Sequence, residues 1–352
     1  MNKKEKYFVS IIWGYSTRMY DFAIEENYHL HILNIAKEIG YKPVVIIKQN
    51  KGGIENDPKF DKDIKVINYK NIFNYLFQII KYSLKGAVFY VNSVESQSLV
   101  VPFFGKKTIF MGHSQPIRQT KIKQKIFNFS MRFFSKMRLN NEEEKDFLLK
   151  QKIKEKKLKV IPLAVSNKIY QFKNDYQNRK DLVYFGNITK TKNPNTILKA
   201  FKIVLEENKD IKLHIIGEIL EKDFEKQIKE LNIFDNVVIH GFCPAEKANE
   251  LLNNFKICIN SSFQEGQCLS VYNAALAGCA LCLPDIMSFR GVFKDKAMFH
   301  IREDYKKLAE NILFYLDNPE IRIRHNNLCR EMIKDDYNYN IISEKLKKML
   351  TF

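Results

Sequence analysis

Residues 261–278 read Ser261-Ser-Phe-Gln-Glu-Gly-Gln-Cys-Leu-Ser-Val-Tyr-Asn-Ala-Ala-Leu-Ala-Gly278 and give the strongest indication of the fold. This stretch follows an apolar run, residues 256–259, that is typical of a buried strand, and it continues as a helix from about Leu269. The Glu265-Gly266 pair between them predicts a tight turn. Such a connection points free backbone N–H groups and the positive end of a helix toward the mouth of a sheet, where an anion binds. The stretch therefore predicts a phosphate-binding turn, and an ordinary strand-turn-helix connection is the alternative.

Strands and helices alternate on both sides of this stretch. In the second half of the chain, apolar runs predict strands at 182–185, 212–216, 237–240, 256–259 and 280–283, and helices at 194–207, 222–231, 245–253 and 269–276. In the first half they predict strands at 7–13, 43–47, 64–67, 87–91 and 107–111, and helices at 28–39, 72–84 and 95–103. This alternation is typical of parallel sheets covered by helices. We therefore expect two doubly wound α/β domains, with ligands at the carboxyl ends of the strands in a cleft between them.

Length and composition agree with two domains. The chain has 352 residues, and a single hydrophobic core stops growing at roughly 250–300 residues. With 45% hydrophobic residues, 13 glycines and 9 prolines, the composition excludes a disordered or collagen-like chain. We predict an N-terminal domain at 1–168 and a C-terminal domain at 180–335, joined by a polar linker at 166–180. A final helix at 338–352 is expected to cross back to the first domain.

Nearly all of the net charge of +18 lies in the first half of the chain. Residues 1–170 hold 31 Lys and Arg against 15 Asp and Glu, whereas residues 171–352 hold 27 against 25. Residues 121–138 fit an amphipathic helix with Ile122, Ile126, Phe129, Phe133 and Met137 on one face. The neighbouring face carries Lys121, Lys125, Arg132 and Lys136. This pattern predicts an anionic membrane surface as partner. A helix that packs its apolar face on the sheet is the alternative, and nucleic acid is not expected because no binding motif accompanies the charge.

The cysteines indicate a reducing compartment and no metal site. Cys279 and Cys282 have metal-ligand spacing, but they lie in an apolar run without a second close pair or a nearby histidine. We expect them to be buried strand residues. The chain opens with no apolar signal core and contains no run of about 18 apolar residues, so a cytoplasmic protein is predicted.

The stretch at 261–278 also resembles the signature of retaining glycosyltransferases of family 4, which have the GT-B fold. That signature is a Glu-Gly turn, a helix with a second Glu eight positions after the first, and an Ala-x-Gly end. The resemblance implies that Glu265 contacts the transferred sugar. It also implies that the turn amides of Gln267, Cys268 and Leu269 hold the diphosphate, and that Gly266 belongs to the same donor-binding turn. Asn273 stands where the family has its second Glu, which binds the nucleotide ribose, so ribose binding is expected to be altered.

A second match lies at 185–201, Phe-Gly-Asn-Ile-Thr-Lys-Thr-Lys-Asn-Pro-Asn-Thr-Ile-Leu-Lys-Ala-Phe. It is similar to the family's strand, Gly-Arg turn, and Lys six residues after the Gly. Lys192 matches that Lys, which implies contact with the diphosphate. Asn187 replaces the family's Arg, and Lys190 is the candidate to supply the missing charge; both lysines have solvated surface positions as the alternative. Glycines at the expected strand and helix ends also agree with the family: Gly186, Gly217, Gly241 and Gly278.

The first half resembles the family only in outline. His113, after the strand at 107–111, stands where the family often has a histidine that contacts the sugar or its phosphate, and Gly14 resembles a close-approach glycine on the acceptor side. An ordinary polar residue at a strand end is the alternative for His113. Residues 337–350 resemble the family's terminal helix.

The resemblance implies a retaining, metal-independent glycosyltransferase with Glu265, Lys192 and His113 in catalytic positions. A nucleotide sugar is its co-substrate, and no cofactor is expected. The predicted acceptor is lipid-linked or a surface-glycan precursor of the lipopolysaccharide or capsule type, at the inner face of the cell membrane. A dinucleotide-dependent enzyme is disfavoured because neither Gly14 nor Gly186 begins a Gly-x-Gly-x-x-Gly run. An inactive GT-B protein that binds a membrane or another anion is the alternative, given Asn187 and Asn273.

Overall fold

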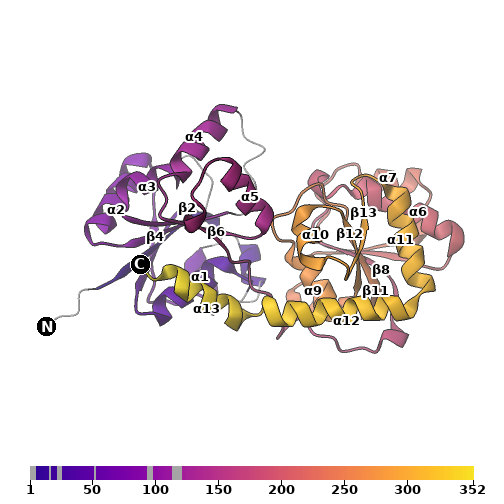
Figure 1. The fold of residues 1–352 in the computed structure, drawn as a ribbon. Coiled ribbons are helices and arrows are strands. Elements are labelled where there is room, and N and C mark those ends of the chain that lie inside the picture. Colours follow the sequence, from indigo (N-terminus) through magenta and orange to yellow (C-terminus); the bar gives the residue numbers. More distant parts are fainter. Residues whose placement is uncertain (1–4, 16, 22–25, 51–52, 93–97, 113–120) are drawn as a thin grey trace. The chain divides into compact units, whose positions relative to one another are not determined.

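The chain forms two compact α/β units, which the computed structural model describes over residues 5–15, 17–21, 26–50, 53–92, 98–112 and 121–352. Unit 1 comprises Met1–Ala164 and Tyr339–Phe352, and unit 2 comprises Val165–Asn338. Each unit has its own parallel sheet with helices on both faces (Figure 1). The alternation of strands and helices in the sequence is therefore confirmed, while the cleft expected between the units stays a prediction.

Unit 1 contains a seven-stranded parallel sheet in the order β3-β2-β1-β4-β5-β6-β7. Its strands are β1 (Tyr7–Tyr15), β2 (Lys42–Asn50), β3 (Lys65–Asn68), β4 (Val88–Asn92), β5 (Lys107–Met111), β6 (Lys136–Leu139) and β7 (Leu158–Val160). One face is covered by α2 (Ile72–Leu84), α3 (Val101–Phe104), α4 (Lys121–Met131) and α5 (Glu142–Lys150), and the other by α1 (Tyr28–Glu38) and α13 (Tyr339–Leu350) (Figure 1). The chain reverses its direction across the sheet between β1 and β4, which makes this a doubly wound unit.

Unit 2 contains a six-stranded parallel sheet in the order β10-β9-β8-β11-β12-β13. Its strands are β8 (Lys180–Phe185), β9 (Leu213–Ile216), β10 (Val237–Gly241), β11 (Phe255–Ile259), β12 (Ala280–Pro284) and β13 (Met298–His300). One core lies under α6 (Pro194–Glu207), α7 (Phe224–Glu230) and α11 (Tyr305–Asp317). The other lies under α8 (Ala245–Leu252), α9 (Leu269–Ala277), α10 (Met287–Phe293) and α12 (Pro319–Asp336).

The segment at 166–180 is not the linker that its polar composition predicts. The backbone N–H of Lys173 donates to Asn253 Oδ1 at 2.6 Å, and that of Gln171 donates to Asn249 Oδ1 at 3.1 Å. Tyr170 is buried in the core beneath α9, and Arg179 is buried as well. The polar residues of this segment are used to bind the ends of α8 and α9, so the units divide at residue 164 instead of within 168–180.

The helix predicted at 121–138 is too long. The structure ends α4 at Met131, and Arg132 and Phe133 form a tight turn with backbone bonds to Phe129 and Ser130. Met137 is then fully buried in β6, between β5 and β7. The periodicity of the apolar residues misled the prediction, because a helix-spaced set continued by chance into a short buried strand.

Two smaller predictions in unit 1 also need correction. β1 continues through Gly14 to Tyr15, so Gly14 lies within the strand and not after it. The helix predicted at 95–103 is, within the described residues, a short 3-10 turn at Ser98–Val100 followed by the four-residue α3.

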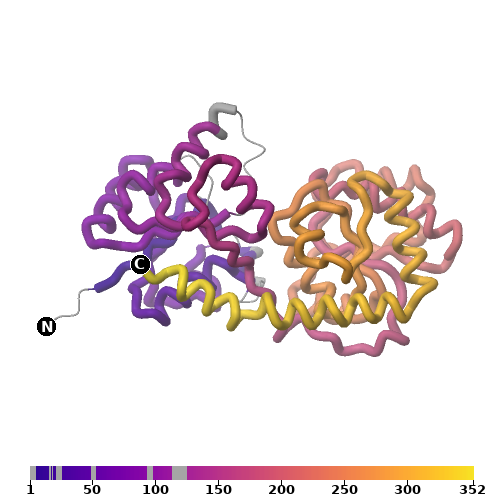
Figure 2. Tube along the Cα trace, viewed as in Figure 1, coloured from indigo at the N-terminus to yellow at the C-terminus, as the bar shows by residue number. Residues whose placement is uncertain are grey.

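The last helix of the chain belongs to unit 1. Figure 2 shows α12 leading into α13, which lies beside α1. His31 Nε2 on α1 is 2.9 Å from Ser343 Oγ on α13, and the His31 ring stacks on Tyr339. Unit 1 therefore contains residues from both ends of the sequence.

Candidate functional site

The best-formed polar cluster of unit 2 lies where the sheet reverses its strand order. β8 and β11 are neighbours, but the chain continues from β8 to β9 on one side and from β11 to β12 on the other. The loops after β8 and β11 therefore diverge and leave a crevice at the carboxyl ends of the strands, which is the usual ligand position in such sheets. Lys192 follows β8 and Glu265 follows β11, and this topology brings them together.

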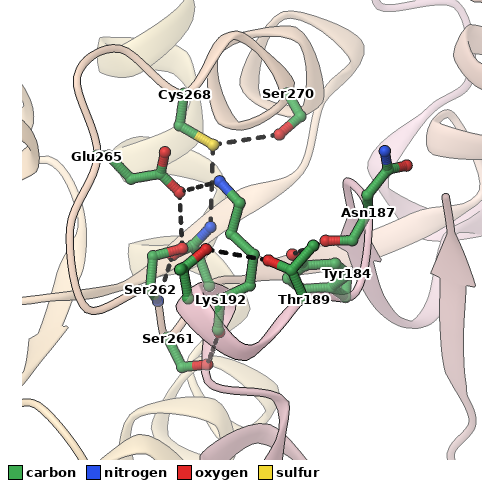
Figure 3. A network of polar contacts seen from close by, with 11 residues as sticks. Tyr184, Asn187, Thr189, Lys192, Ser261, Ser262, Glu265, Cys268 and Ser270 are labelled. Carbon is green, nitrogen blue, oxygen red and sulfur yellow. Dashed lines mark hydrogen bonds and ion pairs between the residues drawn. The ribbon is translucent and has the colours of Figure 1, made fainter. Parts of the chain in front are cut away.

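Lys192 and Glu265 form an ion pair across this crevice (Figure 3). The Lys192 ammonium donates to Glu265 Oε1, and the Ser262 hydroxyl donates to the same oxygen at 2.6 Å. The Glu265 side chain is only 9% exposed. The two charged residues with predicted roles are therefore held in direct contact, although 72 residues separate them in the sequence.

Short-range backbone structure positions Lys192. A single 3-10 turn, Lys190–Lys192, ends at Asn193, whose φ of 51° lets the chain turn into α6 at Pro194. The Ser261 hydroxyl donates to the carbonyls of Lys192 at 2.9 Å and Asn193 at 2.8 Å. Ser261 thus ties the turn after β8 to the loop after β11.

The electrostatics keep Lys192 charged. Burial alone would lower the pKa of the Lys192 ammonium. Its electrostatic interactions with Cys268 and with the Glu265 carboxylate are larger, so the pKa of Lys192 is raised. Burial raises the pKa of the Cys268 thiol to about 11, so this thiol is neutral near pH 7 and Glu265 is the charge that matters. A cation is thus available for an anionic ligand.

The first turn of α9 completes the cluster. Among the residues that the structure describes, no side chain caps this helix at Cys268, so none of them occupies the backbone N–H groups at its start. Gly186 lies next to this turn, because a Cβ added to Gly186 would be 3.6 Å from Ser270 Oγ. A lysine, a glycine turn and a helix N-terminus together suit a phosphate group.

Gly217 is required by the backbone beside this crevice. It has a φ of 143°, and a Cβ there would lie 2.1 Å from the carbonyl oxygen of Gly186. The loops after β8 and β9 therefore approach at a distance that only glycine permits.

Comparison with known families identifies this region. Residues 166–338 match the family described as "Glycosyl transferases group 1". This part of the chain is similar to the glycosyl transferases group 1 family. We call residues 166–338 the group 1 domain; it coincides closely with unit 2.

Relatives and solved structures extend the likeness. The poly(ribitol-phosphate) alpha-N-acetylglucosaminyltransferase of Staphylococcus aureus (strain COL) is 26% identical over 188 residues, 52% of this chain and 38% of the relative. The chain thus spans well under half of that relative's length. HepE of Anabaena, solved with UDP, matches 99% of both chains with a TM-score of 0.80 and 13% identity. WaaG, a glycosyltransferase involved in lipopolysaccharide biosynthesis, matches 98% of this chain and 99% of its own with a TM-score of 0.74 and 12% identity. These likenesses confirm the predicted GT-B fold of two Rossmann-like units.

Asn187 and Asn273, which stand where the family motif has Arg and Glu, differ in their hydrogen bonding. Asn187 Oδ1 accepts the backbone N–H of Glu218 at 3.0 Å, so this side chain joins the loops after β8 and β9 and is not free to replace an arginine. Asn273 on α9 is 3% exposed, and its Oδ1 has no hydrogen-bond partner among the residues that the structure describes. Lys190 is exposed at the rim of the crevice.

The other predicted donor-side residues lie in the expected connections. Gly241 ends β10 with a φ of 71°, and its carbonyl accepts the Gly217 N–H at 2.8 Å. Gly266 and Gln267 form the turn before α9, whose first residue is Leu269. Gly278 ends α9 in a left-handed conformation.

Two serines of the site, Ser261 and Ser262, were not predicted from the sequence. Ser261 and Ser262 hold the lysine turn and Glu265, and Asn260 Oδ1 accepts the Ser262 N–H at 2.9 Å. The signal was present in the sequence as a polar Asn-Ser-Ser run directly after a buried strand. Its partners, however, come from the loop after β8, which the local pattern does not reveal.

The predicted residues of unit 1 are less fully placed. His113 and its candidate role lie outside the described residues, and Gly14 is within β1 at the strand-order reversal. Lys121 is on α4, Lys125 is exposed on α4, and Arg132 is exposed just beyond it. Lys136 was wrongly assigned to the same helix face, because it is the first residue of β6 and donates to the carbonyls of Met349 and Thr351.

Over the described ranges, we find no helix with the length and apolarity needed to cross a membrane.

Cys279 and Cys282 are buried around β12 as free thiols, which agrees with their predicted place in a strand region. Burial raises the pKa of Cys279 to about 12, so it stays protonated and donates toward the Leu252 carbonyl. A neutral thiol is a poor metal ligand.

Proposed function

We propose that the protein transfers a sugar from a nucleotide-sugar donor to an acceptor hydroxyl. The observation that carries this proposal is the Lys192–Glu265 pair beside the uncapped start of α9, at the strand-order reversal of a group 1 domain. The donor diphosphate would lie against the N-terminus of α9 and the Lys192 ammonium.

In this reaction the bond between the sugar's anomeric carbon and the diphosphate oxygen breaks, and a bond to the acceptor oxygen forms. Negative charge grows on the diphosphate as it leaves. Lys192 and the backbone N–H groups at the start of α9 would lie where that charge develops, so they would stabilise the transition state more than the bound donor. The acceptor proton passes to the departing phosphate, so no protein nucleophile is assigned.

Glu265 would exchange its partner when the donor binds. In the free protein its carboxylate accepts from Lys192 and Ser262. With a donor present, Lys192 turns to the diphosphate and Glu265 accepts hydrogen bonds from the sugar hydroxyls, while Ser262 keeps the carboxylate in place. The ion pair thus keeps both groups positioned before the donor arrives.

The finer assignments belong to the same proposal. The motif at 261–278 supports a hexosyl-type, retaining enzyme of family 4 that needs neither metal nor cofactor. The likeness to a poly(ribitol-phosphate) alpha-N-acetylglucosaminyltransferase and to WaaG, a glycosyltransferase involved in lipopolysaccharide biosynthesis, supports a surface-glycan or lipid-linked acceptor. The positive charge of unit 1 supports a cytoplasmic enzyme held peripherally at the inner face of an anionic membrane, with no role for nucleic acid.

The first test is donor binding by the full chain. A nucleoside diphosphate at 100 times its dissociation constant is expected to stabilise the protein by about 2.7 kcal/mol, because it binds only the folded state. Thermal unfolding with UDP, GDP and dTDP would measure this effect, and transfer or hydrolysis with the corresponding sugars would measure activity. If none of these nucleotides moves the melting temperature and none of the sugars is consumed, the proposal fails.

An inactive, anion-binding GT-B protein is the second candidate, and the position of Asn187 favours it. Its side chain is bound to the Glu218 N–H and cannot replace the charge of an arginine. The two candidates separate in one measurement: the binding module would bind a nucleoside diphosphate or an anionic surface without consuming any nucleotide sugar.

Asn273→Ala is expected to weaken nucleoside diphosphate binding about ten-fold, the equivalent of one net hydrogen bond of about 1–1.5 kcal/mol. The buried Oδ1 of Asn273, which has no partner in the described part of the chain, fits a hydroxyl donor from the ligand. Isothermal titration with UDP would measure the change, and Asn340→Ala on the exposed side of α13 is the matched control. Equal affinities for the two variants would remove Asn273 from the site.

A further inference from the structure

An unusual apolar stripe runs along the outer side of α2 in unit 1. The helix buries Tyr75, Ile79 and Tyr82 against the sheet. Its opposite side exposes Phe73 (80% exposed) and Leu84 (84% exposed). A helix that covers one face of a sheet normally presents polar residues to water. An exposed stripe of this kind marks a surface that binds another apolar phase.

The stripe continues across α3 and α4. The Ser83 hydroxyl on α2 donates to the Phe104 carbonyl on α3. The Phe103 ring lies 4.8 Å from that of Phe133 and 6.2 Å from that of Phe129, and all three rings are about half exposed. We call the following exposed residues the apolar face: Ile72, Phe73, Phe77, Ile80, Leu84, Phe103, Phe104, Ile126, Phe129 and Phe133. In Figure 1 the helices α2, α3 and α4 lie on the same face of the sheet.

A basic cavity opens at one end of the apolar face. Its volume is about 310 Å³, and it is lined by Arg132, Lys152, Ile153, Lys154 and Lys157. None of these lining residues is acidic. Across the described part of the chain, none of the four cations takes part in an ion pair, and nearby Glu155 is paired with Lys145 at 3.0 Å instead. Four positive charges thus share one cavity, and no residue within the described ranges is their counter-ion.

The cavity is joined rigidly to the aromatic residues. Lys157 Nζ donates to the carbonyls of Arg132 at 2.7 Å and Phe134 at 2.8 Å, which fixes the turn after α4. Phe133 lies between these two residues in the sequence and belongs to the apolar face. Burial, with Lys154 and Lys156 nearby, lowers the pKa of Lys157, as expected where positive charges lack a counter-ion.

We infer that this basic cavity binds the phosphate of an anionic membrane lipid while the apolar face enters the surface of the bilayer. A lipid supplies both components at the right positions, because its phosphate lies next to its apolar chains. The charge of the whole region agrees: residues 64–141 contain 13 Lys and Arg and one acidic residue, Glu95. The inference rests on the proposed membrane association and not on sugar transfer.

Vesicle binding by the full chain tests this inference. The wild-type protein is expected to bind vesicles of phosphatidylcholine with 30% phosphatidylglycerol and to bind pure phosphatidylcholine vesicles far more weakly. The variant Arg132→Gln/Lys152→Gln/Lys154→Gln is expected to partition about 100-fold less, since each cation near an anionic surface contributes roughly a five-fold factor. The matched control, Lys202→Gln/Lys209→Gln/Lys229→Gln, removes three exposed charges from unit 2 and is expected to stay within two-fold of wild type.

A second pair of variants tests the apolar component. Phe129→Ser/Phe133→Ser is expected to lower partitioning to the same vesicles more than ten-fold, because two aromatic rings no longer enter the bilayer. Phe234→Ser/Leu220→Ser, at exposed positions of unit 2, is the control and is expected to bind like wild type.

The outcomes distinguish a lipid from a free phosphate. Loss of binding in both test variants, with both controls unaffected, supports the lipid site. Normal binding by the phenylalanine variant, together with competition by 10 mM inorganic phosphate at constant ionic strength, would show a site for soluble phosphate and overturn the inference. Normal binding by the charge variant would overturn it as well. Nucleotide-sugar hydrolysis, measured without vesicles, reports separately on the proposed function, and circular dichroism confirms folding of each variant.

Discussion

Lys192→Ala is expected to lower turnover of the nucleotide sugar by about 10²–10³-fold, the effect of removing one preorganised group that stabilises developing charge. The lysine lies beside the start of α9, where the leaving diphosphate would carry its charge, and its raised pKa keeps it protonated. Because this charge grows as the bond breaks, kcat is expected to fall more than the KM for the donor changes. Initial rates over a range of donor concentrations measure both quantities.

Glu265→Ala is expected to reduce turnover to a similar degree by a different route. It removes the carboxylate that would hold the sugar and leaves Lys192 without its partner in the free protein. Glu265→Gln keeps the shape and one acceptor oxygen, so partial recovery is expected. Nucleoside diphosphate binding should survive in both Glu265 variants.

Lys202→Ala is the control for the Lys192 variant. Lys202 is exposed on α6, the helix that follows the Lys192 turn, and is not part of the crevice. It is expected to turn over at the wild-type rate. Near-wild-type turnover by both the Lys192→Ala and the Glu265→Ala variants would contradict the site assignment. The reason is that the assignment depends on the Lys192–Glu265 ion pair at the reversal of strand order between β8 and β11.

Arg179→Ala is expected to lower the free energy of unfolding of unit 2 by about 3–5 kcal/mol, because several buried oxygens lose their donor and each unsatisfied group costs about 1–3 kcal/mol. The Arg179 guanidinium donates to the carbonyls of Ala277 at 2.6 Å, Leu252 at 3.2 Å and Phe255 at 3.2 Å, and to Asn253 Oδ1 at 3.0 Å. It thereby caps the ends of both α8 and α9. Its loss leaves several buried carbonyls without a donor.

Urea unfolding followed by far-UV circular dichroism measures this loss. The single tryptophan, Trp13, lies in β1 of unit 1, so its fluorescence serves as a reference for the other unit. Arg179→Lys keeps the charge but not the planar fork, and an intermediate loss is expected. Arg324→Ala on the exposed side of α12 is the control, with a change within about 0.5 kcal/mol. A stability of Arg179→Ala equal to that of the control would refute this role.

Much of the fold could be predicted because local patterns and tertiary structure agree. Helix α2 occupies the predicted residues, 72–84, and strand β5 the predicted 107–111, since their apolar periodicity reflects burial against a sheet. The prediction was wrong where the same local pattern of apolar or polar residues is compatible with more than one structure. The helix-spaced residues of 121–138 became a helix, a turn and a buried strand, and the polar segment 166–180 became part of the core of unit 2 through Arg179 and Tyr170.

The sequence alone determined the chemistry of the site residues: a lysine after one strand, a glutamate and glycine turn after another, and a helix directly behind them. Local rules suffice for these because strand ends, turns and helix starts depend on neighbouring residues. Only the tertiary structure decided which of them meet. The reversal of strand order between β8 and β11 joins Lys192 to Glu265, and the Asn187 side chain binds a neighbouring loop. The amide oxygen of Asn273 has no partner among the residues described by the structure. In unit 1, too, the sequence located the positive charge, but only the packing of α2, α3 and α4 gathered the exposed aromatic residues beside a basic cavity. The reason is physical: contacts between residues far apart in the chain follow from sheet topology, which no local pattern encodes.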